Sequence, residues 1–227
     1  GGVSAWTCGG FELADAATPP APAADFFRGS DLPFPRHPEF CASTAEVSEA
    51  VESLSGGGGS GAAAPGSGRH VQIGDVRSWV EHIGGGHDYP FPLPTGRIPR
   101  SVWAHWGPST YVAGDLFCHE TGTLHALEAT AQLWRDWGLR LGPDGGRLLF
   151  YCGSGWRSAV AWCVARLLGH EDCASYDGGL LEWAWVERRP LVAGVPVQAD
   201  AADASPRRSE RATAATTALK PVPQTSS

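Results

Sequence analysis

The chain contains no methionine among its 227 residues. Because translation begins with methionine, we expect this sequence to be a trimmed or excised piece of a longer product. Clusters of positive charge are also missing: 17 Lys and Arg stand against 24 Asp and Glu, which gives a formal net charge of -7. A surface that binds nucleic acid needs an excess of Lys and Arg, so this balance argues against nucleic acid as a partner.

Long apolar runs and metal-ligand patterns are absent as well. No hydrophobic stretch approaches the roughly 20 residues that cross a bilayer, and the N-terminus lacks a signal-peptide pattern, so we predict no membrane partner. The six cysteines form no C-x-x-C pair, and the eight histidines are scattered. Such cysteine spacing is typical of reduced thiols in a reducing intracellular compartment (cytoplasm, mitochondrion or plastid) and disfavours a disulfide framework or a zinc site. We therefore predict neither a metal nor a cofactor.

Three segments of low complexity divide the chain. Residues 13–34 are rich in Ala and Pro and predict a linker, residues 55–68 predict a flexible Gly-rich insertion, and residues 199–227 predict a disordered tail. An ordered domain is left over residues 35–198. Residues 1–12 open with GGVSAW, and the end of the domain carries GGLLEW. Both segments follow the pattern Gly-Gly-x-x-x-Trp. This similarity is either a coincidence or a sign that residues 1–12 are a remnant of an upstream domain of the same kind, and we favour the remnant.

Helix and strand patterns alternate inside the ordered domain. Ser43 and Glu46 form a capping box before a helix over residues 44–54. Strands are predicted at residues 70–76, 101–106, 147–151 and 173–176. Further helices are predicted at residues 78–83, where Ser78 is the cap, at 124–137, at 158–169 and after the glycines at 178–179. The run RLLFY at residues 147–151 shows no alternation, as in a central parallel strand. The pattern predicts an α/β domain with a mostly parallel central sheet flanked by helices.

The stretch YCGSGWRSA, residues 151–159, places a cysteine at the carboxyl end of the central strand. Ligands of open α/β sheets bind at these strand ends. Gly153 and Gly155 let main-chain N–H groups converge, the next helix directs its N-terminus at the loop, and Arg157 adds a positive charge. These features favour a thiolate at Cys152. A core cysteine needs neither two glycines nor an arginine, whereas Cys163 in mid-helix fits a core position.

Two chemistries suit a thiolate held in this way. It can attack a sulfane sulfur and become a persulfide, or attack phosphorus and become a phosphocysteine, as in a cysteine phosphatase or an arsenate reductase. Four residues separate Cys152 from Arg157. Cysteine phosphatases use a loop one residue longer, because a phosphoryl group needs a wider cradle, and they need a general acid that this loop does not contain. The shorter loop favours the persulfide.

Four blocks of the sequence resemble, in order, the motifs of rhodanese-domain sulfurtransferases. They are GDVRS at residues 74–78, GRIP at 96–99, YCGSGWRS at 151–158 and YDGGLLEW at 176–183. The last two are most similar to thiosulfate-sulfurtransferase-like members. The resemblance implies a rhodanese-like doubly wound α/β domain over residues 35–198. It also implies a ping-pong reaction that moves sulfur from a small donor anion such as thiosulfate to cyanide or a thiol acceptor.

The resemblance also implies roles for the residues of the loop. Cys152 would carry the persulfide. The donor anion and the sulfur would be held, in a solvent-reachable cleft, by Gly153, Ser154, Gly155, Trp156 and Arg157. For Ser154, contact with the anion and exposure to solvent stay open; for Trp156, shielding of the persulfide and core packing stay open.

Other positions bear on the structure or on the donor. Asp75 and Arg77 are expected to form a salt bridge that fixes the end of a strand. Arg100 stands where the family usually has a small residue, and we expect it to be solvated. The segment 82–95 is longer than in compact rhodaneses and is expected to overhang the site. Mercaptopyruvate sulfurtransferases also open their loop with CGSG, but the arginine inside this loop, Arg157, favours thiosulfate over 3-mercaptopyruvate. A rhodanese-like interaction module without turnover is a further alternative.

Overall fold

The computed structural model describes residues 7, 9–13, 37–56, 70–117 and 121–196. Most of the predicted linker, Gly-rich insertion and tail, and most of the segment 1–12, lie outside these residues. The first two residues of the predicted insertion, Ser55 and Gly56, are the end of a helix, α2 (Thr44–Gly56). In the part of the chain that is described, no helix is both long and apolar enough to cross a membrane.

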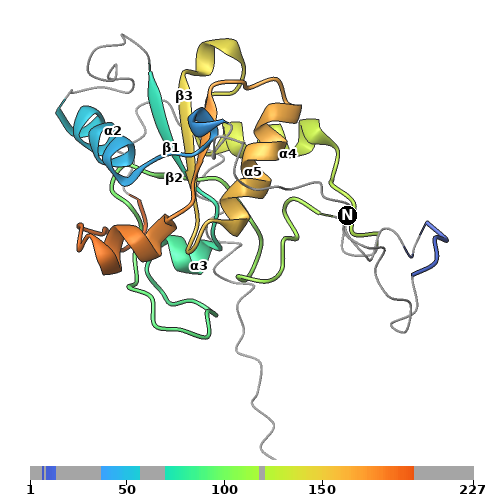
Figure 1. Cartoon of the computed structure of the whole chain (residues 1–227), viewed down its shortest axis with the longest axis horizontal. Helices are drawn as coiled ribbons and strands as arrows, with labels where there is room; N and C mark the ends of the chain where they lie inside the picture. Colours follow the sequence, from blue (N-terminus) through green and yellow to red (C-terminus); the bar gives the residue numbers. More distant parts are fainter. Residues whose placement is uncertain (1–6, 8, 14–36, 57–69, 118–120, 197–227) are drawn as a thin grey trace, which may run out of the picture.

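The core of the domain is a four-stranded sheet. Its strands are β1 (Val71–Asp75), β2 (Val102–Trp103), β3 (Arg147–Tyr151) and β4 (Cys173–Tyr176), arranged in the order β2-β1-β3-β4. All three pairings are parallel, with Asp75 opposite Tyr151 and Tyr151 opposite Tyr176. The parallel sheet confirms the predicted α/β class (Figure 1). It also brings the carboxyl ends of β1, β3 and β4 to one edge.

Helices cover both faces of this sheet (Figure 1). On one face pack α2 and a short π-helix, η3 (Leu181–Val186), which contribute Val47, Ala50 and Trp183 to a cluster with Ile73 and Leu149. The other face holds α4 (Leu127–Asp136) and α5 (Trp156–Leu167). Successive side chains of β3 therefore pack into the apolar clusters on opposite faces of the sheet, which explains why its sequence is apolar without alternation.

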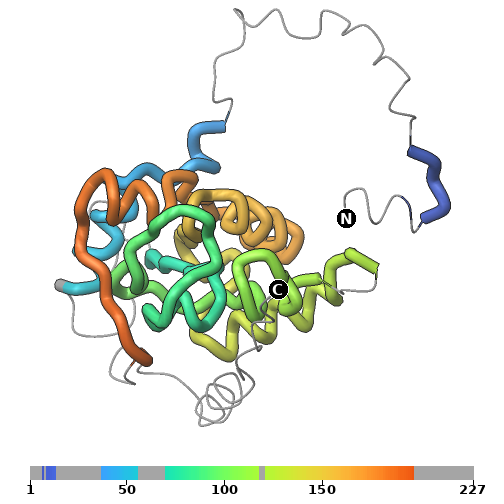
Figure 2. The backbone as a smooth tube through the Cα atoms, turned by 90° about the horizontal axis from the view of Figure 1, so that it is seen from below, coloured from blue at the N-terminus to red at the C-terminus, as the bar shows by residue number. Residues whose placement is uncertain are grey.

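Smaller elements complete the chain between these layers. They are α3 (Trp79–His82) and two turns of 3-10 helix, η1 (Pro38–Phe40) and η2 (Pro143–Gly145). The predicted cap of α3 is present, since Ser78 and Glu81 bond each other's main-chain N–H groups. The strand predicted at 101–106 is shorter in the structure, because His105 takes a left-handed conformation with φ 47° and turns the chain. In Figure 2 the segments that follow α3 and β2 lie in front of the sheet.

A buried ion pair closes the end of β1, as the sequence predicts. Arg77 donates from Nε to Asp75 Oδ1 at 2.8 Å and from Nη2 to Oδ2 at 2.7 Å. His82 Nδ1 lies 2.8 Å from Asp75 Oδ2, and the Tyr151 hydroxyl donates to the same oxygen at 2.8 Å. A further bond from Arg77 to the Gly96 carbonyl, 2.7 Å long, ties the GRIP block to the network. Asp75 and Arg77 thus join three of the four sequence blocks, since Tyr151 begins the third.

These contacts set the charge state of Asp75. Burial acts to raise the pKa of its carboxyl, but the charge of Arg77 and the hydrogen bonds from His82 and Arg77 outweigh burial and hold the pKa well below its ordinary value of 3.8. A depressed pKa in the folded state means that the unfolded chain binds the proton more tightly. Asp75 therefore stabilises the fold above its ordinary pKa, and this contribution is lost as the pH falls.

We expect the free energy of unfolding to decline as the pH falls below about 5, most steeply below the ordinary pKa of 3.8, and Asp75→Asn to flatten that decline. The measurement is urea unfolding at a series of pH values, on the wild type and the variant. Glu128→Gln is the matched control, since Glu128 is 85% exposed and pairs with Arg135 at 3.5 Å. An equal pH dependence in wild type and Asp75→Asn would contradict this account.

Candidate active site

The loop between β3 and α5 consists of Cys152, Gly153, Ser154 and Gly155. The chain turns sharply at Gly155, where φ is 92°, a conformation that favours glycine. A Cβ there would lie 2.4 Å from Asp177 Oδ1 and 2.6 Å from the Asp177 carbonyl oxygen, so neighbouring chain also excludes a side chain. This turn lets α5 start at Trp156, two residues earlier than the sequence predicts.

The sulfur of Cys152 lies inside the curl of this loop, and Cys152 is fully buried. The main-chain N–H of Gly155 donates to Sγ at 3.1 Å, and the Ser158 hydroxyl lies 4.0 Å from Sγ. The sulfur also faces the N-terminal end of α5, a 12-residue helix whose dipole favours negative charge. One amide contacts the sulfur where the sequence suggested several, and Ser158 was not foreseen as a neighbour, although it stands directly after Arg157.

The YDGGLLEW block fixes the outer side of the loop. The carbonyl of Cys152 accepts a bond from the N–H of Leu180 at 2.9 Å, and the carbonyl of Gly153 accepts one from Leu181 at 3.0 Å. A trans peptide directs its N–H opposite its carbonyl. The N–H groups of Gly153 and Ser154 therefore point away from η3, and neither has an acceptor among the described residues. These two amides are available to an anion or to a second sulfur atom.

Arg157 is fully buried, so the prediction that it faces a solvent-reachable cleft is wrong. Its guanidinium donates to both carboxylate oxygens of Glu81, at 2.8 and 2.9 Å, and to the hydroxyl of Tyr89 at 2.6 Å. Burial acts to raise the pKa of Glu81, but the hydrogen bond and the charge of Arg157 outweigh it and lower that pKa below 4.5. Arg157 is thus an ion-paired residue beside the loop, and its positive charge is largely neutralised.

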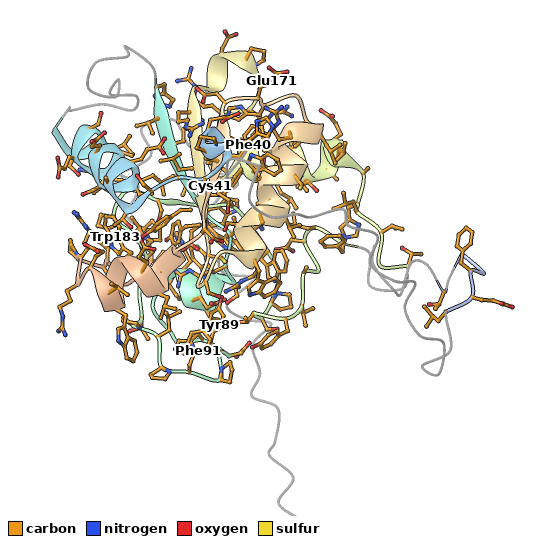
Figure 3. All side chains as sticks on the ribbon, in the orientation of Figure 1. Phe40, Cys41, Tyr89, Phe91, Glu171 and Trp183 are labelled. Carbon is orange, nitrogen blue, oxygen red and sulfur yellow. The ribbon has the colours of Figure 1, made fainter. Side chains whose placement is uncertain are left out.

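The segment after α3 covers the loop, as its length suggested. The ring of Tyr89 lies directly on Gly153, where a Cβ would come within 2.2 Å of the hydroxyl oxygen. Asp88 accepts a bond from the N–H of Thr110 at 3.2 Å, which joins this segment to the one after β2. Tyr89 and Phe91 lie together below the sheet in Figure 3, with ring centroids 5.0 Å apart. Tyr89 therefore separates Cys152 from solvent.

The remaining predicted residues occupy different surroundings. Trp156 is 43% exposed at the start of α5 and lies edge-on to Trp106, with centroids 5.4 Å apart. Ser154 is half-buried. Arg100 lies against α2, where its Nε donates to the Ser55 hydroxyl at 3.4 Å. The structure therefore brings Ser154 and Trp156 to the Cys152 loop but places Arg100 on another part of the surface.

A parallel α/β sheet with a cysteine between the end of β3 and the start of α5 is the architecture that the resemblance to rhodanese domains implied. The family model for the rhodanese-like domain matches residues 62–184. The chain belongs to the rhodanese-like domain family.

The chain is also similar to individual proteins of known sequence or structure. Thiosulfate sulfurtransferase YnjE of Escherichia coli (strain K12) is 32% identical over 119 residues, which are 52% of this chain and 26% of that protein. The anaerobic ergothioneine biosynthesis enzyme of Chlorobium limicola, in complex with trimethyl histidine, superposes with a TM-score of 0.67 at 29% identity, over 86% of this chain and 40% of that one. A variant of the ergothioneine enzyme EanB, in a cysteine persulfide form with ergothioneine, gives a TM-score of 0.67 at 28% identity over the same shares of the two chains. The chain thus spans less than half the length of each relative.

Because Arg157 is paired with Glu81 in the interior, its substitution should lower the stability of the fold. Arg157→Ala leaves the Glu81 carboxylate buried without its cation, and we expect the free energy of unfolding to drop by about 3–5 kcal/mol. Urea unfolding at neutral pH measures this. Arg166→Ala is the control on the same helix, because Arg166 is exposed and, among the described residues, donates to the Glu171 carbonyl alone, at 2.8 Å. Equal stability of Arg157→Ala and wild type would contradict the importance of the pair.

Proposed function

We propose that this domain is a sulfurtransferase in which Cys152 carries a sulfane sulfur as a persulfide. The contact that supports this most directly is the 3.1 Å hydrogen bond from the Gly155 N–H to Sγ, made at the N-terminus of α5. A hydrogen-bond donor and a helix dipole at the sulfur both favour thiolate over thiol. A cysteine that served packing alone would gain nothing from either.

The first half-reaction requires no proton. The Cys152 thiolate attacks the outer sulfur of thiosulfate, a new S–S bond forms, and the old S–S bond breaks with its electron pair leaving on sulfite. The free N–H groups of Gly153 and Ser154 would hold the donor anion, since the charge of Arg157 is already paired with Glu81. 3-Mercaptopyruvate, whose carboxylate needs a cation, is the less favoured donor.

In the second half-reaction a nucleophile removes the outer sulfur and regenerates the thiolate. Cyanide and small thiols are the acceptors that we propose first. Trimethyl histidine is a second candidate, supported by the similarity to the ergothioneine enzyme and by the partial exposure of Trp156 beside the loop. Aromatic faces of this kind bind quaternary ammonium groups.

Intact-mass measurement after incubation with thiosulfate tests the proposal. We expect the wild type to gain the mass of one sulfur atom, to release sulfite, and to lose that mass again when an acceptor is added. Cys152→Ser should gain nothing. Cys163 is exposed on α5, so the expectation that it occupies a core position is wrong. Cys163→Ser is the matched control, and it should load like the wild type.

Other outcomes would replace the proposal. Loading that survives Cys152→Ser would assign the sulfur to another cysteine. Hydrolysis of an aryl phosphate without any sulfur gain would favour phosphatase chemistry. Neither reaction, in a folded protein, would favour an interaction module.

A further inference from the structure

The Tyr89 hydroxyl is buried beside the Cys152 loop. Tyr89 is 9% exposed, and its ring lies on Gly153. The guanidinium of Arg157 reaches the hydroxyl oxygen at 2.6 Å and is itself held by two bonds to Glu81. The hydroxyl group therefore has a fixed position next to the reactive cysteine, although it comes from a surface loop (Figure 3).

The proton of this hydroxyl has no acceptor among the described residues. A guanidinium can only donate, so the Tyr89 oxygen is the acceptor in its bond with Arg157. The O–H of Tyr89 is then left to donate elsewhere, and a buried donor without an acceptor costs free energy. Burial, together with the negative charge of Cys152, raises the pKa of Tyr89 to about 12, so the phenol keeps its proton at neutral pH. An acceptor at the sulfur site would satisfy this donor.

We propose that the Tyr89 O–H donates a hydrogen bond to the outer sulfur of the Cys152 persulfide and thereby speeds its transfer to the acceptor. This inference rests on the proposed sulfurtransferase function. The outer sulfur lies about 2 Å beyond Sγ and carries the negative charge of the persulfide. A nucleophile attacks it poorly while that charge is unshared, and a neutral donor draws the charge away from the reacting atom.

The bonds and charges of the transfer step balance without an additional reagent. The acceptor forms a bond to the outer sulfur, and the S–S bond to Cys152 breaks. The electron pair of that bond moves to Sγ, where the Gly155 N–H at 3.1 Å stabilises the thiolate. Tyr89 keeps its proton throughout. Arg157 and Glu81 act through Tyr89 by positioning its hydroxyl.

The test separates the two half-reactions. Tyr89→Phe keeps the ring on Gly153 and removes only the hydroxyl. In single-turnover experiments we expect loading from thiosulfate, followed by sulfite release, to stay within about threefold of wild type, and thiocyanate formation from cyanide to slow by about tenfold or more. Tyr111→Phe is the control, because Tyr111 is 62% exposed and its hydroxyl has no hydrogen bond within the described part of the chain. It should leave both steps unchanged.

A second substitution distinguishes a hydrogen-bond donor from a structural cover. Site-specific replacement of Tyr89 by 3-fluorotyrosine keeps the shape of the ring and makes the phenol a stronger donor, so thiocyanate formation should be at least as fast as in wild type. Slowing of both half-reactions by the same factor in Tyr89→Phe, with an unchanged melting temperature, would overturn the role of the hydroxyl. So would wild-type transfer in that variant. If the wild type itself takes up no sulfur, the proposed function fails and not the assignment of Tyr89 alone.

Discussion

The ion pair between Glu81 and Arg157 is the contact on which the arrangement of the site depends. Glu81 comes from α3 and caps that helix, while Arg157 comes from the first turn of α5. Both are buried, and two hydrogen bonds of 2.8 and 2.9 Å join them. Removing either partner would leave an uncompensated charge in the interior, which is far costlier than losing an exposed pair. The pair therefore fixes α3, the start of α5 and Tyr89 relative to one another.

A second buried ion pair stands directly beside the first. Parallel pairing sets Asp75 opposite Tyr151, one residue before Cys152, and the Tyr151 hydroxyl donates to Asp75. Arg77 extends from Asp75 to the carbonyl of Gly96, at the far end of the segment that carries Tyr89. The segment that covers the cysteine is thus anchored at both ends by charged groups. Tyr89 and Leu93 of the same segment also pack in the apolar cluster with Ile73 and Leu149, so ion pairs and apolar packing together fix its position.

Sequence patterns predicted the sheet, the α3 cap, the salt bridge at the end of β1 and the loop around Cys152. The cap and the salt bridge depend on residues close together in sequence: Asp75 and Arg77 are two apart, and Ser78 and Glu81 are three apart. The pairing of Arg157 with Glu81 could not be predicted in this way, because it joins residues 76 apart and requires the sheet to be assembled first. An arginine in a cysteine loop looks like an anion ligand until a buried carboxylate is placed next to it. The same holds for Tyr89, whose contact with Gly153 depends on the path of a long loop.

Neutralisation of Arg157 leaves the main chain as the source of positive potential at the sulfur. The Gly155 N–H contacts Sγ, and the N–H groups of Gly153 and Ser154 have no partner in the described structure. Their directions are fixed by the bonds that Leu180 and Leu181 make to the carbonyls on the other side of the loop. A side-chain cation could follow a departing anion, but amides held in this way cannot move with it. In the sulfurtransferase reaction that we propose, they would stabilise the thiolate and the persulfide alike and so favour both resting states of the cysteine. Selectivity between the two half-reactions must then come from a group that contacts only the outer sulfur, and a neutral hydroxyl fixed by a buried ion pair satisfies that requirement without adding charge to the site.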